Sequence, residues 1–146
     1  MKKLFSLAVS ALFSLTLFAS DPVIVNDKVL QAFQKSFKNA SDVTWNEYGN
    51  SFEVKFVYNE IDSRITYHKD GSVARVIRYY GESQLPLLLR SRLQKQFDGK
   101  TVFGVTEFSQ ENEMDYFIVL EDATTWSYVK CSASGEMRVY KELKKS

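Results

Sequence analysis

Cysteine and histidine are almost missing from this chain of 146 residues, which contains one of each, Cys131 and His68. A single thiol cannot form a disulfide within the chain. Cys131 lies in a strand-like run, so we predict a small buried side chain there. A nucleophilic Cys131 with His68 as its base is the alternative. His68 itself is predicted to be a solvated strand residue rather than a functional base.

The chain also lacks an excess of charge of either sign. The chain has 19 basic and 18 acidic residues, a net charge of +1, and its basic residues are dispersed. No field strong enough to attract nucleic acid follows from this balance. The sequence also has no phosphate-binding loop, metal-ligand spacing, nucleophile elbow or calcium loop. We therefore predict a protein that is not an enzyme, with no catalytic residues, metal site or cofactor, and that does not bind nucleic acid.

No apolar run is long enough to cross a membrane comfortably. The longest, residues 4–18, follows two lysines and precedes two small residues at positions 19 and 20. This pattern predicts a secretory signal peptide over residues 1–20 and a periplasmic or secreted bacterial protein. Because Leu17 and Phe18 weaken the cleavage site, an uncleaved membrane anchor is the alternative.

The chain is rich in hydrophobic residues, at 45%, and in aromatic residues, at 14%, and these residues recur in two similar halves. Each half begins with apolar residues four positions apart, the spacing of a helix stripe, and continues with alternating strand residues. The helix stripes are Val29, Phe33 and Phe37, then Leu89, Leu93 and Phe97. The matching strand residues are Phe52, Val54 and Phe56, then Tyr116, Ile118 and Leu120. This agreement predicts two tandem repeats, at residues 21–81 and 82–146.

Capping and turn residues set the expected elements. Asn26 or Asp27 is predicted to cap the first helix and Ser83 the second. The Asp70-Gly71 pair predicts a hairpin. The expected strands are 43–48, 51–58, 62–69, 73–80, 102–108, 114–121, 125–131 and 136–142.

Four residues at the entries to the two sheets are predicted to pack under the helices. They are Val43, Trp45, and their counterparts Phe103 and Val105. The last strand does not alternate cleanly, so the faces of Met137, Val139 and Tyr140 stay open. The predicted fold class is α+β, with two tandem α-β-β-β-β repeats. One helix per repeat covers one face of antiparallel sheet, and the other face is open. A unit of about 60 residues is marginal alone, so we expect both repeats to pack as one domain.

The layout resembles the PepSY-like, beta-lactamase-inhibitor-protein-like (BLIP-like) family of secreted bacterial proteins. The resemblance covers about residues 25–143 and is carried by "VLQAFQKSFKNASDVTW", "SFEVKF" and "YHKDGSVARV". The second half departs from it, with Val105 in place of the tryptophan and Ser134-Gly135 in place of Asp-Gly. The resemblance implies two tandem α-β4 units and a concave sheet that grips a protein partner. It supplies no catalytic residues.

Strand alternation also predicts which residues face away from the helices. In the first half these are Glu53, Lys55, Val57, Arg64, Thr66 and His68, which are polar or charged except for Val57. In the second half they are Phe117, Val119, Glu121, Trp126, Tyr128 and Lys130. Clustered aromatic residues on a surface tend to mark interaction sites, so Phe117, Val119, Trp126, Tyr128 and Lys130 are the predicted partner-binding residues. Two alternatives are a reversed alternation in this half, and coverage by the N-terminal segment or a dimer mate.

The predicted function is that of a secreted, non-catalytic binding protein that recognises a periplasmic or cell-surface protein through its open sheet face. One alternative is an inhibitor or regulator of a secreted hydrolase. Another is a small-molecule or lipid carrier that uses the same face. A homodimer through an exposed edge strand is a further prediction. Membrane contact is expected only through an uncleaved signal segment.

Overall fold

The computed structural model describes residues 23–146, so the predicted signal peptide lies outside the described residues. The first half comprises α1 (Asp27–Ser36), β1 (Ser41–Tyr48), β2 (Ser51–Tyr58), β3 (Ile61–His68) and β4 (Val73–Tyr80). The second half comprises the short 3-10 helix η1 (Glu82–Gln84), α2 (Leu87–Gln96), β5 (Thr101–Gln110), β6 (Glu113–Glu121), β7 (Thr125–Ser132) and β8 (Met137–Lys144). The strands begin and end within two residues of the predicted ranges. Within the described range, no helix is long and apolar enough to span a membrane.

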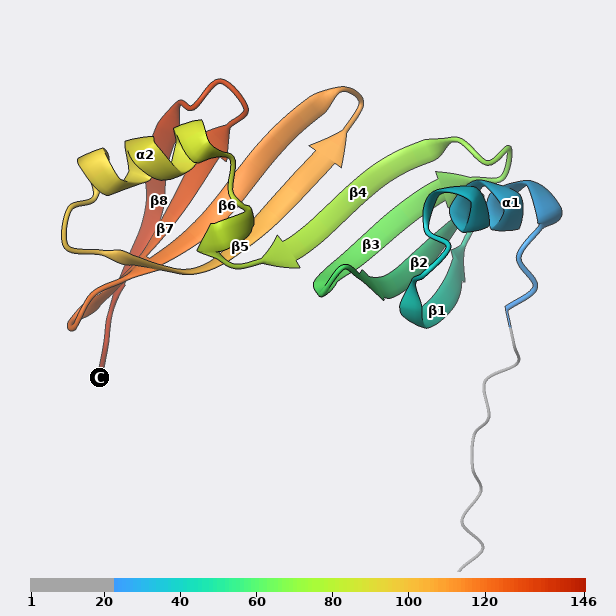
Figure 1. Cartoon of the computed structure of the whole chain (residues 1–146), viewed down its shortest axis with the longest axis horizontal. Helices are drawn as coiled ribbons and strands as arrows, with labels where there is room; N and C mark the ends of the chain where they lie inside the picture. Colours follow the sequence, from blue (N-terminus) through green and yellow to red (C-terminus); the bar gives the residue numbers. More distant parts are fainter. Residues whose placement is uncertain (1–22) are drawn as a thin grey trace, which may run out of the picture.

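The eight strands form one antiparallel sheet in which each strand pairs with its neighbours in the sequence, from β1 to β8. The sheet is continuous across the middle of the molecule because β4 pairs with β5. Figure 1 shows the two halves side by side along the long axis, each with its helix. The fold is therefore α+β, as predicted.

Both helices cover the same face of this sheet. Val76 and Tyr80 lie on one face of β4, because even-numbered residues of a strand share a side. Val76 packs against the core under α1, and Tyr80 packs against the core under α2. The opposite face has no helix over it in the part of the chain that the structure describes. We call this opposite side the open face.

Each helix covers its own hydrophobic core. The first core is largely aromatic, with Phe33 of α1 in contact with Phe56 at 5.0 Å and Trp45 at 5.4 Å between ring centroids. The second core is mostly aliphatic: Leu85, Leu89, Leu93, Val105, Tyr116, Ile118, Leu120, Val129 and Cys131. Tyr116, Ile118 and Leu120 of this core are the helix-facing residues that alternation predicts, so the alternative of a reversed alternation in the second half is wrong.

Helix α1 begins where the sequence predicts. The Asn26 side chain accepts a hydrogen bond from the Val29 amide at 3.1 Å, as an N-cap does. The same side chain donates to the Lys69 carbonyl at 2.9 Å, in the turn between β3 and β4. The helix is therefore tied to a hairpin that lies 43 residues further along the chain.

The prediction that Ser83 caps the second helix is wrong. Ser83 lies in η1, and α2 begins only after Pro86, which makes no side-chain cap. Proline disfavours a helical backbone in the residue before it, and Leu85 is extended at φ −63° and ψ 140°. The helix therefore cannot start before Pro86, while the Leu85 side chain still enters the core.

The prediction that Val43 and Phe103 pack under the helices is also wrong, because a β-bulge lies at each position. The pairing of β1 shifts between Ser41 and Thr44, and that of β5 shifts between Val102 and Gly104. A bulge inserts one extra residue and reverses the alternation locally. Phe103 is consequently 64% exposed. Trp45 and Val105, beyond the bulges, do pack in the cores.

A third bulge explains the irregular alternation of the last strand. Tyr128 pairs with Lys141 and Val129 with Val139, so Tyr140 is the extra residue of β8. Met137 packs against the second core. Tyr140 instead contacts aromatic rings of the open face.

Candidate interaction surface on the open face of β5–β8

Aromatic and aliphatic side chains gather on the open face of the second half. Paired residues of antiparallel strands share a face, and the pairs here are Phe117 with Lys130, Val119 with Tyr128, and Glu121 with Trp126. All five predicted partner-binding residues therefore lie on one surface, on the side away from α2. We call the following set the aromatic face: Phe103, Phe117, Val119, Trp126, Tyr128, Tyr140 and Leu143.

The rings of the aromatic face partly cover one another. Phe103 meets Trp126 edge to face at 4.8 Å between centroids. Tyr140 lies 6.3 Å from Phe117 and 6.2 Å from Tyr128. As a result, the residues on β6 and β7 are half-buried, whereas Phe103 and Tyr140 are 64% and 50% exposed. This mutual packing holds the rings in place before any partner arrives.

Sequence reasoning missed Phe103 and Tyr140 because both occupy bulges: alternation placed Phe103 under the helix and left the face of Tyr140 open. Weak signals were present. Gly104 follows Phe103 inside a strand, and an isolated glycine in a strand often marks a bulge. The irregular alternation around Tyr140 likewise indicated the bulge in β8.

Lysine side chains lie over three of these rings. The ammonium nitrogen of Lys145 is 4.3 Å from the Trp126 ring centroid. Lys141 is 5.4 Å from Tyr128, and Lys130 is 5.7 Å from Phe117. These are cation–π distances, at which the positive charge is attracted to the ring face.

Two of the three lysines also have acidic partners. Lys145 pairs with Glu121 at 2.7 Å and Lys130 with Asp115 at 2.8 Å. Among residues 23–146, Lys141 forms no ion pair.

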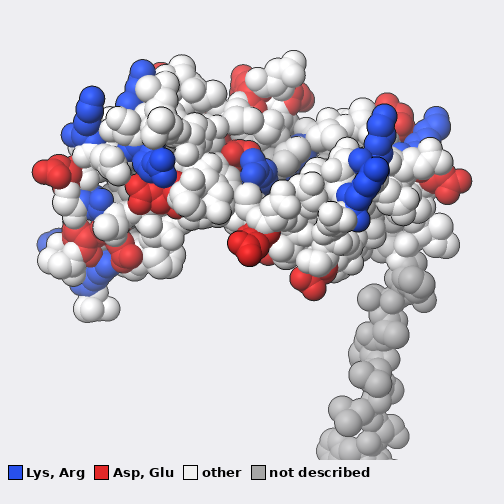
Figure 2. Space-filling model, in the orientation of Figure 1, with Lys and Arg blue, Asp and Glu red and all other residues white. Residues whose placement is uncertain are grey.

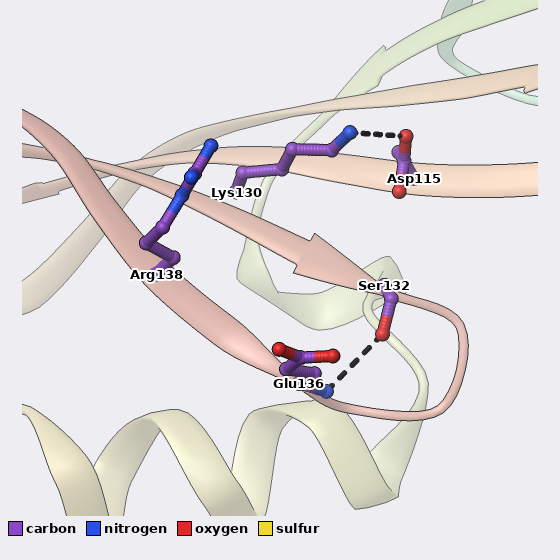
Figure 3. Close-up of a pocket in the computed structure, with 5 residues that line it drawn as sticks. All are labelled: Asp115, Lys130, Ser132, Glu136 and Arg138. Carbon is purple, nitrogen blue, oxygen red and sulfur yellow. Dashed lines mark hydrogen bonds and ion pairs between the residues drawn. The ribbon is translucent and has the colours of Figure 1, made fainter.

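A polar hollow of about 270 Å³ adjoins the aromatic face at the turn between β7 and β8. Its lining residues are Asp115, Lys130, Ser132, Glu136 and Arg138. Figure 3 shows the side chains of Lys130 and Arg138 on the same side of their strands, with the Lys130–Asp115 ion pair beside them. The Ser132 hydroxyl accepts a hydrogen bond from the Glu136 amide at 3.2 Å, which shapes the turn.

The open face of the first half has a different character. Glu53 faces away from α1 as predicted, but it is buried rather than solvated, at 4% exposure. Its carboxylate lies 3.7 Å from Arg64 Nε and 3.6 Å from Arg75 Nη2. Sequence alternation cannot predict this burial, because the two arginines come from β3 and β4 and cover Glu53 only in the assembled sheet.

Cys131 and His68 do not form a site. Cys131 is fully buried under α2, as predicted, and burial raises the pKa of its thiol. His68 is exposed at the end of β3, with β4, β5 and β6 between it and the strand of Cys131. The alternative of a Cys131–His68 catalytic pair is therefore wrong. No group of three or more potential metal ligands occurs among the described residues.

Charge on the surface is mixed. Figure 2 shows basic and acidic residues interspersed along both halves on that side of the molecule, with no large region of one sign.

This architecture, one antiparallel sheet with two helices on a single face, is the BLIP-like fold. A BLIP-like protein from Bacteroides fragilis superposes with a TM-score of 0.63 at 12% identity, over 86% of this chain and 92% of that one. A DUF2874 family protein from Bacteroides uniformis gives a TM-score of 0.59 at 14% identity, over 83% and 90%. A protein provisionally described as periplasmic, from Bacteroides eggerthii, gives 0.60 at 16% identity, over 84% and 90%.

At these identities the likeness defines the fold alone. No family model and no curated protein matches the chain. The PepSY part of the resemblance stays a prediction.

Proposed function

We propose that the protein is a secreted, non-catalytic binding protein that recognises a periplasmic or cell-surface protein through the aromatic face. The supporting observation is the gathering of partly exposed aromatic rings on a sheet surface that no described helix covers. Tyrosine and tryptophan are typical anchors of protein interfaces. Their mutual packing lowers the entropy lost when a partner immobilises them.

The two halves, residues 21–81 and 82–146, are proposed to be copies of one α-β4 module. In this proposal the second copy became the binding copy. Phe117 and Val119 occupy the outward positions that Glu53 and Lys55 hold in the first half. A signal peptide at residues 1–20 would deliver the protein to the cell envelope, and one of the similar structures is provisionally described as periplasmic.

The test is affinity capture from an envelope extract of the bacterium that produces the protein. Three baits are compared: the wild type, the double variant Trp126→Ala/Tyr128→Ala, and Tyr79→Ala as the control. Tyr79 is 40% exposed on the open face of β4, outside the aromatic face. We expect the double variant to lose a partner that the wild type and Tyr79→Ala both retain. Equal recovery of every captured protein by all three baits would reject the aromatic face as the binding surface.

An inhibitor or regulator of a secreted hydrolase is a special case of this function, and the description of one similar structure as BLIP-like favours it. Titration of the protein into assays of envelope proteases and lactamases tests it, with the double variant as control. A complete lack of inhibition would remove this case and leave the binding function standing.

A small-molecule or lipid carrier is the remaining alternative, with the aromatic face as its lining. Native mass spectrometry of protein purified from its own host distinguishes the two classes. A retained ligand that the double variant loses would favour the carrier.

A further inference from the structure

Two cations face each other across β7 and β8. Lys130 lies directly opposite Arg138 in the antiparallel register, on the open face. Like charges in directly opposite positions of a sheet repel and destabilise it. Asp115 neutralises Lys130 at 2.8 Å, but Arg138 forms no ion pair with any residue in the described range. The strands therefore hold an uncompensated guanidinium beside a second cation.

The guanidinium borders a space into which another molecule can reach. Arg138, Lys130 and the Ser132 hydroxyl line the hollow of about 270 Å³ (Figure 3). Lys130 also lies over the Phe117 ring, so the hollow opens directly beside the aromatic face. Lys141, the next outward-facing cation of β8, lies over Tyr128 and has no acidic partner among residues 23–146.

Glu136 is the one acidic group of the hollow that neutralises neither cation. It lines the hollow, and it forms no ion pair with Arg138 in the described part of the chain. With Lys141 included, three basic residues meet the two acidic residues Asp115 and Glu136 here. The local balance is positive, and removing the Glu136 charge should make it more so.

We propose that the partner of the aromatic face presents an acidic side chain, which enters this hollow and pairs with Arg138, with Lys141 as a second contact. This inference rests on the proposed function and specifies the chemistry of the partner. A carboxylate would relieve the repulsion between Lys130 and Arg138 and could accept two parallel hydrogen bonds from the guanidinium. An apolar side chain next to that carboxylate would lie on the rings of Phe117 and Tyr140.

The experiment is a titration of the isotope-labelled protein, followed by NMR, with two peptide probes. One is acetyl-Phe-Glu-Glu-amide and the other is its uncharged counterpart, acetyl-Phe-Gln-Gln-amide. We expect the acidic peptide to shift the amide signals of Lys130, Arg138 and Lys141 in a saturable way. It should bind about fivefold more tightly than the uncharged peptide, and the difference should shrink in high salt.

Three variants locate the charge effect. Arg138→Gln should abolish the preference for the acidic peptide, and Glu136→Gln should increase it. Lys55→Gln is the matched control, because Lys55 is an exposed cation on the open face of the first half. Its substitution should leave the preference unchanged.

Equal affinity for both peptides, an unchanged preference in Arg138→Gln, signals that move only in the first half, or no shift up to the solubility limit would each overturn the inference. Its failure is distinct from failure of the proposed function. If Trp126→Ala/Tyr128→Ala loses a captured protein that Arg138→Gln retains in full, the aromatic face binds a partner without an acidic anchor.

Discussion

Glu53 shows that the face of a strand residue does not decide its exposure. Its position on β2 points away from the core, yet its side chain is covered by Arg64 and Arg75 from the two strands that follow. Those arginines carry like charges on neighbouring strands, and the Nε atoms of both are buried without a hydrogen-bond partner. The Glu53 carboxylate compensates two positive charges at once, which makes it the central ion of the first half.

Substituting Glu53 should therefore destabilise the fold. We expect Glu53→Gln to lower the free energy of unfolding by about 1–3 kcal/mol, because it leaves two guanidinium groups without a counter-ion. Urea denaturation followed by far-ultraviolet circular dichroism measures this. Lys38→Gln, which removes an exposed cation that forms no ion pair among residues 23–146, should shift the midpoint little. Equal midpoints for the two variants would show that the ion cluster contributes nothing.

Asp122 provides a second prediction, which concerns pH. Hydrogen bonds from the Lys100 ammonium group, the Thr125 hydroxyl and the Thr124 amide hold the pKa of Asp122 well below its usual range. A carboxyl group with a lowered pKa in the folded state stabilises the protein above its unfolded pKa, about 3.9, and loses that effect as the pH falls below it. We expect the stability difference between the wild type and Asp122→Asn to be constant near neutral pH and to shrink on acidification below about pH 4. Urea midpoints measured across this range test it, and a difference that stays constant throughout would contradict it.

At the scale of elements, each helix is fastened to the last hairpin of its own half, β3–β4 in the first and β7–β8 in the second. Gly71, at φ 90°, lies so close to α1 that an added Cβ would be 3.1 Å from the Lys28 carbonyl oxygen. In the second half, Arg92 of α2 donates to the Ser134 carbonyl at 2.9 Å, next to Gly135 at φ 86°. The two hairpin turns thus contact their helices at equivalent positions but through different groups. The first uses backbone contact and the second a long cationic side chain.

Gly71→Ala should break the closer of these two contacts. The substitution imposes a left-handed backbone on a residue with a Cβ and pushes that atom against a carbonyl oxygen that belongs to the helix. We expect a loss of about 1–3 kcal/mol in the free energy of unfolding, measured by urea denaturation. Gly81→Ala is the matched control, since Gly81 has a negative φ and an added Cβ there meets nothing within 4 Å. Similar midpoints for the two variants would mean that the hairpin moves away from α1 at little cost.

At the scale of the whole molecule, the pairing of β4 with β5 turns two small units into one sheet. A half-buried polar cluster reinforces this seam on the helix side. Arg78 Nη1 of β4 donates to Glu107 Oε1 of β5 at 3.0 Å, and the Tyr80 hydroxyl donates to the other oxygen of the same carboxylate. Burial and this hydrogen bond raise the pKa of Tyr80. Each half has its own core, so the seam decides whether the halves unfold together.

Glu107→Ala should weaken that coupling. The chain has two tryptophans, Trp45 in the first half and Trp126 in the second. Trp126→Phe and Trp45→Phe versions of the protein therefore report the unfolding of one half each by fluorescence. We expect the two reporters to give the same urea midpoint with Glu107 intact and separate midpoints with Glu107→Ala, because Arg78 and Tyr80 lose their shared partner. Coincident midpoints in the variant would show that backbone pairing alone couples the halves.

Local patterns in the sequence determined the order of the elements and most of their helix-facing residues; the exceptions, Val43 and Phe103, lie at bulges. Val29 and Phe33 recur at the helix period, and Tyr116 and Ile118 alternate at the strand period. Only a helix packed on one face of the sheet removes all four side chains from water, and all four are buried. This is why both cores and the strand limits could be predicted from the sequence. The same alternation predicted that Phe117, Trp126 and Tyr128 share the sheet face opposite the helices.

The tertiary structure decided what depends on neighbours from other strands. Phe103 and Tyr140 join the aromatic face because bulges reverse their sides, and a bulge is set by the pairing register rather than by the residue itself. Glu53 is buried by side chains more than ten residues away in the sequence, and Arg138 meets Lys130 only once β7 and β8 pair. Local periodicity carries no information about such contacts. The hydrophobic architecture was therefore readable from the chain, and the charges around its candidate binding surface were not.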